Sequence, residues 1–375
     1  MSQKRLPAVF MRGGSSKGVF FHASDLPDNR ESRDKIFLSV LGSPDPYGRQ
    51  LNGMGGGISS LSKAVVINPS SRTDADIDYT FAQIAVRDEI VDYSSNCGNL
   101  SSAVGPFSID TGLIEADGEY KEIIIYNTNS NKLIRSRVPV IGGCAKVSGA
   151  FSIPGVSGTG SKIQLDFLDP GGTTTGALLP SGNASDTLRL HNHGEFEVSL
   201  VDSSVPCVFV AAERLGLTGG ESIEELESSH TIMTVVEQIR VAAGVKMGLG
   251  KSTEKIPPTI PKVGIVAQPL SYLTLAGTPI DATKASLTTR IWSMGQVHRV
   301  LPLTGAMCLA TACRIPGTIC QKLSRFNDSG IKLANPSGIL PLDAEVDIQG
   351  ETITARHVTA YRTARTLMEG HILIP

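Results

Sequence analysis

The sequence predicts a two-domain α/β fold rich in short strands, and three observations lead to that prediction. The chain has 375 residues, enough for two domains with separate hydrophobic cores. Its 39 glycines suit the turns between many short strands. Two helical patterns built almost entirely of small residues stand about 200 residues apart, one in each half of the chain. We therefore expect two similarly built domains.

The expected strands are short runs of β-branched or alternating apolar residues, broken by Gly, Pro, Asn and Asp. They span residues 64–68, 77–86, 122–127, 133–141, 163–167 and 196–201. Helical periodicity is rarer. It predicts a surface helix over residues 31–41 and one long helix, or two, over residues 222–243.

The two small-residue helices are expected over residues 98–112 (GNLSSAVGPFSIDTG) and 305–313 (GAMCLATAC). Gly, Ser and Ala offer few side chains to keep water away, so each helix must pack closely inside a domain. The exposed backbone N–H groups at its N-terminus could then face a ligand.

Composition and charge exclude several classes of partner. A net charge of −2 and 5% aromatic residues provide neither the basic face nor the stacking surface that nucleic acids require. The N-terminus has no apolar run of signal-peptide length, and no segment approaches the ~20 apolar residues of a membrane span. The six cysteines lack the spacing of a disulfide framework. We expect a cytoplasmic protein with reduced thiols and no membrane partner.

The first candidate motif is Asn96-Cys97-Gly98-Asn99, directly before the first small-residue helix. A helix N-terminus favours a thiolate, and the free N–H groups of Gly98, Asn99 and Leu100 can hold an anion. The motif therefore favours a functional Cys97, with a buried structural cysteine as the alternative.

The second motif is the loop over residues 53–63, GMGGGISSLSK, which ends at Lys63 before an apolar strand. Its glycines allow close approach of the backbone to a ligand, and Ser59 and Ser60 offer hydroxyls. A partly desolvated lysine can act as a general base. A solvated lysine that only precedes the strand is the alternative.

The third motif, over residues 12–18, places Arg12, Ser15, Ser16 and Lys17 on a flexible turn. Two cations and two hydroxyls suit a carboxylate or phosphate clamp, although an ordinary exposed hairpin turn is equally compatible. No segment matches a nucleotide-binding loop, and His191 and His193 lack partners at metal-ligand spacing. We expect chemistry by side chains alone, with no metal and no cofactor.

Six segments also carry a resemblance to a known family. They are MRGGSSKGVFF, GSPDPYGRQLNGMGGGISSLSK, DYTFAQ and NCGNLSSAVGPFSIDTGLI in the first half, and SMGQVHRVLPLTGAMCLATACRIPGTI and RTARTLMEGHILIP in the second. From about residue 7 to its C-terminus the chain resembles the methylaconitate isomerase family, which includes methylitaconate Δ-isomerase, 4-oxalomesaconate isomerase and aconitate Δ-isomerase.

This resemblance implies the diaminopimelate epimerase-like fold, in which each of two similar domains is a curled mixed sheet around a central helix and the active site lies in the cleft between them. We expect domains over residues 1–185, carrying Lys63 and Cys97, and 186–355. The segment 356–375 is expected to return to the first domain. The family isomerises small unsaturated polycarboxylates by allylic proton transfer without metal or organic cofactor.

Carried over by position, the family's essential lysine and cysteine fall on Lys63 and Cys97. The motifs and the resemblance together name these substrate-binding candidates: Arg12, Ser15, Ser16, Lys17, Ser59, Ser60, Asn96, Gly98, Asn99, Leu100, Ser293, Met294, His298, Thr304 and Gly305. Two departures from the family pattern are Asn52, where many members have Asp, and Cys308, where many have Ala. The second makes Cys308 a candidate second thiol.

Three functional hypotheses follow. In the favoured one Lys63 is the base and Cys97 the partner acid, while helix N-termini at Gly98 and Gly305 hold carboxylates. The second is a Cα epimerase or racemase that uses Cys97 and Cys308 as a thiol pair. The third is a non-catalytic, carboxylate-binding accessory protein. The sequence does not choose among aconitate, methylaconitate, methylitaconate and oxalomesaconate, and a homodimer is only the base-rate expectation.

Overall fold

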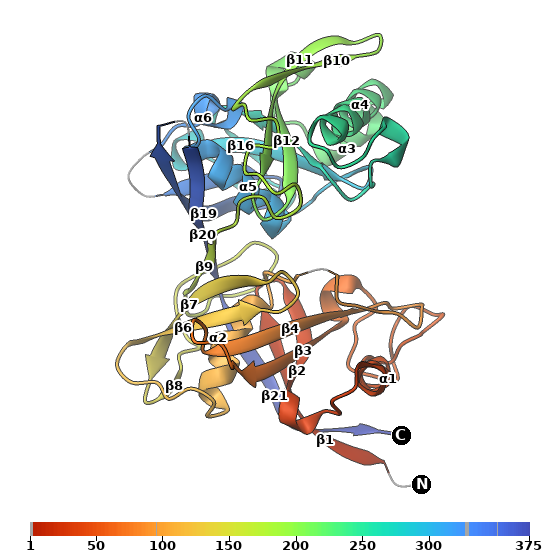
Figure 1. Cartoon of the computed structure of the whole chain (residues 1–375), viewed down its shortest axis with the longest axis vertical. Coiled ribbons are helices and arrows are strands. Elements are labelled where there is room, and N and C mark those ends of the chain that lie inside the picture. Colours follow the sequence, from red (N-terminus) through yellow and green to blue (C-terminus); the bar gives the residue numbers. More distant parts are fainter. Residues whose placement is uncertain (1–2, 95, 327–329, 351) are drawn as a thin grey trace. The chain divides into compact units, whose positions relative to one another are not determined.

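The chain forms two compact units. The computed structural model describes residues 3–94, 96–326, 330–350 and 352–375 (Figure 1). The first unit comprises Met1–Phe167 and Tyr361–Pro375, and the second comprises Leu168–Ala360. The domain boundaries expected after residues 185 and 355 both lie within this second unit.

The first unit contains one mixed sheet. In the order in which they pair, its strands are β21 (Ala364–Ile374), β1 (Lys4–Gly13), β2 (Ser16–His22), β3 (Lys63–Pro69), β4 (Ile77–Ile84), β6 (Tyr120–Asn127), β7 (Lys132–Ile141) and β9 (Ile163–Leu168). The short β5 (Val91–Asp92) pairs antiparallel with the end of β4, and the short β8 (Cys144–Ala145) pairs antiparallel with the end of β7. The C-terminal β21 therefore belongs to the sheet of the N-terminal unit.

The sheet curls around α2 (Ser101–Asp110), which contacts β1, β4, β6, β7 and β21. Every residue of α2 except Asp110 is buried. A Cβ atom on Gly105 would lie 2.6 Å from Val138, so only a glycine permits this close packing. Helix α1 (Arg30–Leu41) begins at the Asn29 cap and contacts β4, β5 and β21. The helices expected over residues 31–41 and 98–112 are both present.

The second unit contains a second mixed sheet. In pairing order its strands are β10 (Asp186–Leu190), β11 (Gly194–Asp202), β12 (Pro206–Ala211), β13 (Lys262–Ala267), β16 (Leu287–Ser293), β18 (Ile331–Asn335), β19 (Gly338–Gln349) and β20 (Thr352–Arg362). The short β17 (Gln296–Val297) pairs antiparallel with the end of β16, and β14 (Tyr272–Leu273) pairs with β15 (Pro279–Ile280). All six strands expected from the sequence are present, as β3, β4, β6, β7, β9 and β11.

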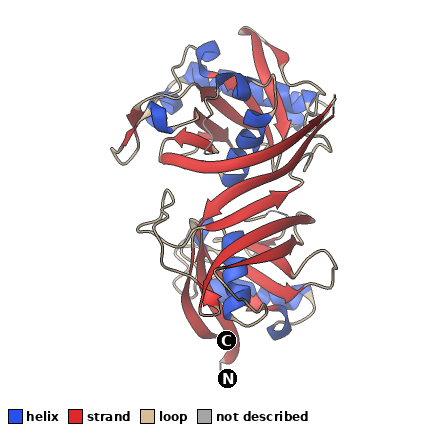
Figure 2. Ribbon diagram, turned by 90° about the vertical axis from the view of Figure 1, so that its left-hand side faces the viewer, coloured by secondary structure: helices blue, strands red, loops and turns tan. Residues whose placement is uncertain are grey.

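Helix α5 (Leu303–Arg314) is the central helix of the second unit, and it contacts β11, β12 and β19. Its residues from Gly305 to Cys313 are all buried, as the expected helix over residues 305–313 requires. The segment over residues 222–243 forms two helices, α3 (Ile223–Ser228) and α4 (His230–Lys246). A short α6 (Ile319–Leu323) follows α5. Figure 2 shows helices packed against strands within each unit.

The two units share one strand connectivity. From β21 to β9, two pairs of neighbouring strands are parallel, β2 with β3 and β4 with β6. The other five pairs are antiparallel. From β10 to β20 the second unit repeats the same series. In both, the central helix connects the fifth strand of this order to the sixth. This repetition matches β3 with β13, β4 with β16, and α2 with α5.

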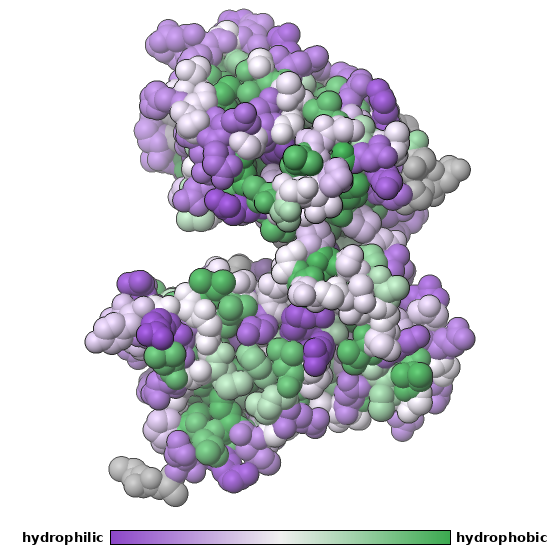
Figure 3. All heavy atoms as spheres, turned by 180° about the vertical axis from the view of Figure 1, so that it is seen from behind, coloured by the Kyte–Doolittle hydropathy of each residue, from purple (hydrophilic) through white to green (hydrophobic). Residues whose placement is uncertain are grey.

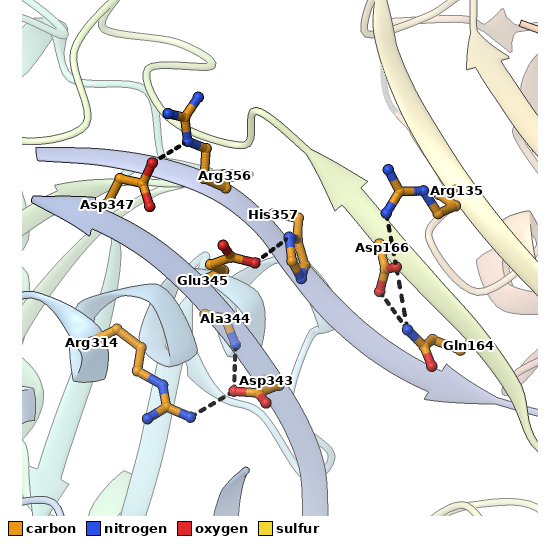
Figure 4. A network of polar contacts seen from close by, with 10 residues as sticks. All are labelled: Arg135, Gln164, Asp166, Arg314, Asp343, Ala344, Glu345, Asp347, Arg356 and His357. Atoms are coloured by element: carbon orange, nitrogen blue, oxygen red, sulfur yellow. Dashed lines mark hydrogen bonds and ion pairs between the residues drawn. The ribbon is translucent and has the colours of Figure 1, made fainter.

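Many charged side chains on these strands have a partner of opposite charge (Figure 4). In the second unit Arg356 pairs with Asp347 at 2.6 Å, and His357 lies 3.4 Å from Glu345 on the neighbouring strand. In the first unit Arg135 lies 4.0 Å from Asp166. Such partly exposed pairs stabilise a fold only slightly.

On the face shown in Figure 3, hydrophobic residues lie among hydrophilic ones in both units. Of the helices in the described ranges, none combines the length and the apolar character needed to cross a bilayer.

Candidate active site

Lys63 occupies the first position of β3 and is 7% exposed. Its Nζ atom donates to Oε1 of Gln83 at 2.6 Å and lies 4.8 Å from the ring centre of Phe81. Within the described residues no carboxylate forms an ion pair with Lys63. The amine is therefore held by a neutral acceptor in a largely desolvated position.

Gln83 is a site residue that the sequence did not single out. It lies directly opposite Lys63 in the antiparallel pairing of β3 and β4. Its Nε2 donates to the carbonyl oxygens of Ser59, at 3.1 Å, and Ser62, at 2.9 Å. Those two bonds fix the amide so that its oxygen faces Lys63. Through Gln83, the glycine-rich loop that carries Ser59 and Ser60 is tied to the lysine.

Cys97 precedes α2 and is 8% exposed. Its carbonyl oxygen accepts hydrogen bonds from the Tyr79 hydroxyl at 3.2 Å and from both N and Oγ of Ser101 at 3.1 Å. The preceding Asn96 accepts a bond from the buried Asn127 at 2.7 Å. No side chain caps the N-terminus of α2. The first N–H groups of α2 itself donate to backbone carbonyls before the helix. Within the described residues no partner is found for the N–H groups of Gly98, Asn99 and Leu100, which remain available to an anion.

Gly18 brings the lysine strand and the cysteine helix together. A Cβ atom at Gly18 would lie 3.0 Å from both Cδ1 of Leu100 and the carbonyl oxygen of Lys63. The start of β3 and the turn before α2 thus pack against the same glycine. Lys63 and Cys97 come from neighbouring elements of one unit.

The loop over residues 12–18 packs on Asn99. Gly14 has a φ of 52°, and a Cβ atom there would clash with the Asn99 side chain, so glycine is required. Nδ2 of Asn99 donates to Oγ of Ser15 at 3.3 Å. Arg12 donates to the carbonyls of Gly14 and Thr363, and burial together with nearby Arg365 lowers the pKa of Arg12. Ser16 is buried, and Lys17 lies over the Phe10 ring.

Arg362, at the end of β20, was also missed from the sequence. It is 6% exposed, and its Nε donates to Oδ1 of Asn99 at 3.1 Å. Its NH1 donates to the Tyr361 carbonyl at 2.8 Å, and no carboxylate of the described chain pairs with it. Burial lowers the pKa of Arg362 to about 10, so the side chain is still a cation at neutral pH. An unpaired buried charge beside Asn99 favours an anionic ligand there.

The remaining candidates lie in the second unit. Ser293 ends β16, Met294 is 65% exposed on the following turn, and Thr304 and Gly305 lie in the first turn of α5. The Ser293 hydroxyl accepts a bond from Nζ of Lys262 at 2.9 Å. Burial, and to a lesser degree the charge of Lys262, lowers the pKa of His298. Lys262 is a further residue that the sequence did not single out.

Cys308 is not an accessible thiol. It is fully buried in α5, and its Sγ donates to the Val201 carbonyl at 3.4 Å. Burial, reinforced by Cys207, raises its pKa well above the ordinary value of a thiol. Such a group is poorly suited to exchange a proton with a substrate near neutral pH, which weakens the thiol-pair hypothesis.

Metal-ligand side chains are dispersed in the part of the chain that the structure describes. Within residues 3–94, 96–326, 330–350 and 352–375, no three His, Cys, Asp or Glu side chains are placed to share a metal ion.

Comparison with known proteins identifies the family. The family model described as "PrpF protein" matches residues 3–375. The chain is 38% identical to the 3-methylitaconate isomerase of Eubacterium barkeri, over 99% of the chain and 98% of that protein. It is 36% identical to the 2-methyl-aconitate isomerase of Cupriavidus necator, over 100% of the chain and 98% of that protein.

Solved structures agree with the sequence comparison. A crystal structure of methylitaconate-delta-isomerase superposes with a TM-score of 0.94 at 36% identity, covering 100% of this chain and 96% of that one. A hydroxyproline epimerase from Agrobacterium vitis, 12% identical, has a TM-score of 0.51 over 100% of this chain and 94% of its own. This second likeness shows the fold alone. The expected α/β architecture with epimerase-like domains is confirmed, as is the resemblance to the methylaconitate isomerases. The chain therefore belongs to the PrpF protein family.

Proposed function

We propose that this protein is an isomerase that moves a C=C bond in a small unsaturated di- or tricarboxylate by allylic proton transfer, without a metal or organic cofactor. Methylitaconate and methylaconitate, which appear in the names of the relatives, are the first substrates to test, with aconitate and oxalomesaconate beside them.

In the proposed reaction Lys63 acts as the base. Its neutral amine takes a proton from the allylic carbon, and the electron pair of that C–H bond forms the new C=C bond. The former C=C pair moves toward a carboxylate, which becomes an enediolate. The backbone N–H groups before α2 stabilise this developing charge. A proton delivered to the other end of the allylic system, from Cys97 or from the Lys63 ammonium, completes the shift.

The observation that carries this proposal is the position of Lys63. It is an almost buried amine, hydrogen-bonded to an amide oxygen and to no carboxylate, and it packs beside the turn before α2. Arg362 and Arg12 add positive charge around Asn99, as a substrate with several carboxylates requires.

Isomerisation in D₂O tests the proposal. We expect turnover of at least one of the four substrates, followed by ultraviolet absorbance, with solvent deuterium entering the allylic carbon. The Lys63→Arg variant should be folded and inactive, because a guanidinium stays protonated and cannot accept the proton. Substantial activity in Lys63→Arg would overturn the assignment of the base. No turnover of any of the four substrates would overturn the proposed function.

The Cα epimerase hypothesis receives less support, because its second thiol, Cys308, is fully buried and hydrogen-bonded. The accessory-protein hypothesis is also weaker, since the chain has both Lys63 and Cys97, and the start of β3 and the turn before α2 pack against the same Gly18.

A further inference from the structure

Gln50 lies at the buried centre of the loop between α1 and β3. It is 1% exposed and has a φ of 53°, in the left-handed region that residues other than glycine rarely adopt. Its backbone N–H donates to Oδ2 of Asp45 at 2.5 Å, and its carbonyl oxygen accepts the Gly53 N–H at 3.2 Å. An unfavourable backbone conformation of this kind persists only where the surrounding contacts impose it.

The side-chain amide of Gln50 makes three hydrogen bonds. Its Nε2 donates to the hydroxyl oxygens of Ser43, at 2.8 Å, and Ser62, at 2.7 Å. Its Oε1 accepts the Gly57 N–H at 2.9 Å. Both donor protons and the acceptor oxygen of the amide are therefore in use. An ionised glutamate has no proton to donate, and an apolar side chain forms none of these bonds, so this position requires an amide.

Two glycines of the glycine-rich loop pack against Gln50 and its neighbours. A Cβ atom on Gly55 would clash with the Gln50 amide. Gly57 has a φ of 75°, and a Cβ atom there would clash with the carbonyl oxygen of Gly48. This packing accounts for glycine at both positions without a bound ligand. The loop is folded around the Gln50 amide.

Ser62 connects Gln50 to Lys63. Ser62 is fully buried and directly precedes the lysine. Its hydroxyl accepts from Gln50, and its carbonyl oxygen accepts from Nε2 of Gln83 at 2.9 Å. The oxygen of Gln83 in turn accepts from the lysine amine at 2.6 Å. A continuous series of hydrogen bonds therefore joins the Gln50 amide to the amine of Lys63.

We propose that Gln50 is a positioning residue for Lys63. With 1% of its surface exposed, Gln50 is too buried to contact a substrate. It acts by fixing Ser62, whose carbonyl oxygen helps to set the direction of the Gln83 amide and hence the place of the amine. The inference rests on the proposed function for the role of Lys63 as the base.

Two substitutions remove the same hydrogen bond from opposite ends. Gln50→Met has no N–H to donate, and Ser62→Ala loses the accepting hydroxyl but keeps its carbonyl. Each should lower kcat about tenfold with little change in KM, because a displaced base slows the chemical step more than it weakens binding. Neither loss should exceed that of Gln83→Met, since all three act through one contact. Ser62→Ala retains the other two bonds of the Gln50 amide, so it serves if Gln50→Met folds poorly.

Ser43→Ala is the matched control. It removes the other acceptor of the same Nε2 atom, at the end of the amide that does not lead to Lys63. It should lower the thermal unfolding midpoint without lowering kcat. The double variant Ser62→Ala with Gln83→Met then separates positioning from general stability. In the Gln83→Met background, Ser62→Ala should cause little further loss of kcat, and losses that simply multiply would overturn the proposal.

Labelling of lysines with trinitrobenzenesulfonate, located by mass spectrometry, provides a readout that does not need turnover. Lys63 should react faster in Gln50→Met and in Ser62→Ala than in the wild type, relative to the exposed Lys251. Calorimetric titration with tricarballylate, a saturated tricarboxylate that cannot isomerise, should show little change in affinity. Unchanged labelling of Lys63 in both variants would overturn the positioning role. A protein that isomerises none of the four substrates would contradict the proposed function and still leave the labelling decisive.

Discussion

Lys63 and Gln83 face one another across β3 and β4, with 2.6 Å between the Nζ atom of the lysine and Oε1 of the glutamine. The amide is held by two backbone carbonyls, so its oxygen cannot turn away without breaking both bonds. A neutral oxygen positions the amine but does not stabilise its charged form as a carboxylate would. This relationship suits a lysine that must give up a proton before it can accept one.

Gln83→Glu therefore has a clear expected result. A carboxylate at this contact would hold Lys63 as an ammonium ion, and kcat should fall by about 10²–10⁴-fold, the usual contribution of a general base. The variant also loses the two hydrogen bonds that the amide N–H groups donate to the carbonyls of Ser59 and Ser62, so its thermal unfolding midpoint should be measured beside the activity. Activity lost in Gln83→Glu should partly return as the pH is raised. Gln83→Met, which removes the acceptor without adding charge, is the control and should lose less activity.

Cys97→Ser separates proton transfer from substrate binding. Serine keeps nearly the same volume and hydrogen bonding, but it is a much weaker acid than a thiol. We expect kcat to fall by about 10²-fold or more with little change in KM, as for a group that acts mainly in the transition state. Steady-state kinetics measures this directly. Normal turnover in Cys97→Ser would show that the thiol takes no part in proton transfer and that Cys97 only helps to form the anion-binding start of α2.

Alkylation of Cys97 provides an independent readout. Cys144 is the exposed cysteine of the described chain and would react first, so the measurement needs a Cys144→Ser background. There, iodoacetamide should label Cys97 ahead of the four fully buried thiols, and tricarballylate should protect it. Labelling that is equally fast with and without the ligand would place Cys97 outside the binding site.

Asn99→Asp tests the role of the Arg362 charge. The new carboxylate would pair with Arg362 at the present 3.1 Å contact and cancel the positive charge available to a substrate. KM should rise about ten- to a hundredfold, while the thermal unfolding midpoint should stay the same or increase, because a buried guanidinium gains a partner. Asn68→Asp adds the same charge at an exposed position of the first unit and should change neither quantity. An unchanged KM in Asn99→Asp would show that Arg362 serves only the fold.

The His298 environment predicts a loss of stability in acid. Burial and Lys262 lower the folded-state pKa of His298 below its ordinary value of 6.5. The unfolded chain therefore binds a proton at a higher pH than the folded chain does. The contribution of the neutral ring to the free energy of unfolding is complete above pH 6.5 and is lost as the pH falls through the folded-state pKa. Urea unfolding between pH 5 and 8 measures this effect. As the pH falls, the free energy of unfolding should decrease less for His298→Gln than for the wild type.

Local pattern located six strands of this fold, whereas others, including β1, β2, β13 and β16, were not among the strands expected from the sequence. Alternating and β-branched runs located β3, β4 and β6, because those strands present one or both faces to a core. The small-residue composition of α2 and α5 correctly indicated helices enclosed by other elements. Pro106 does not interrupt α2. The division of residues 222–243 into α3 and α4 coincides with the Ser229 cap, whose side chain accepts the Ile232 N–H at the start of α4.

The partners of the site residues were harder to predict. Gln83 and Arg362 act through contacts set by strand register and by the return of the chain to the first unit, and neither follows from local sequence. Lys262 did leave a signal. The segments KAVVI, from residue 63, and KVGIV, from residue 262, are both a lysine followed by a buried strand. Aligning the two halves on their central helices would have found it.

The pairing of β1 with β21 has a consequence for how this protein is made. All ten residues of β1 are matched to residues of β21, the last strand of this sequence to be synthesised. Residues 168–360, by contrast, form one uninterrupted stretch. The half carrying Lys63 and Cys97 therefore cannot close its sheet until residues 364–374 have been translated, after every residue of the other unit.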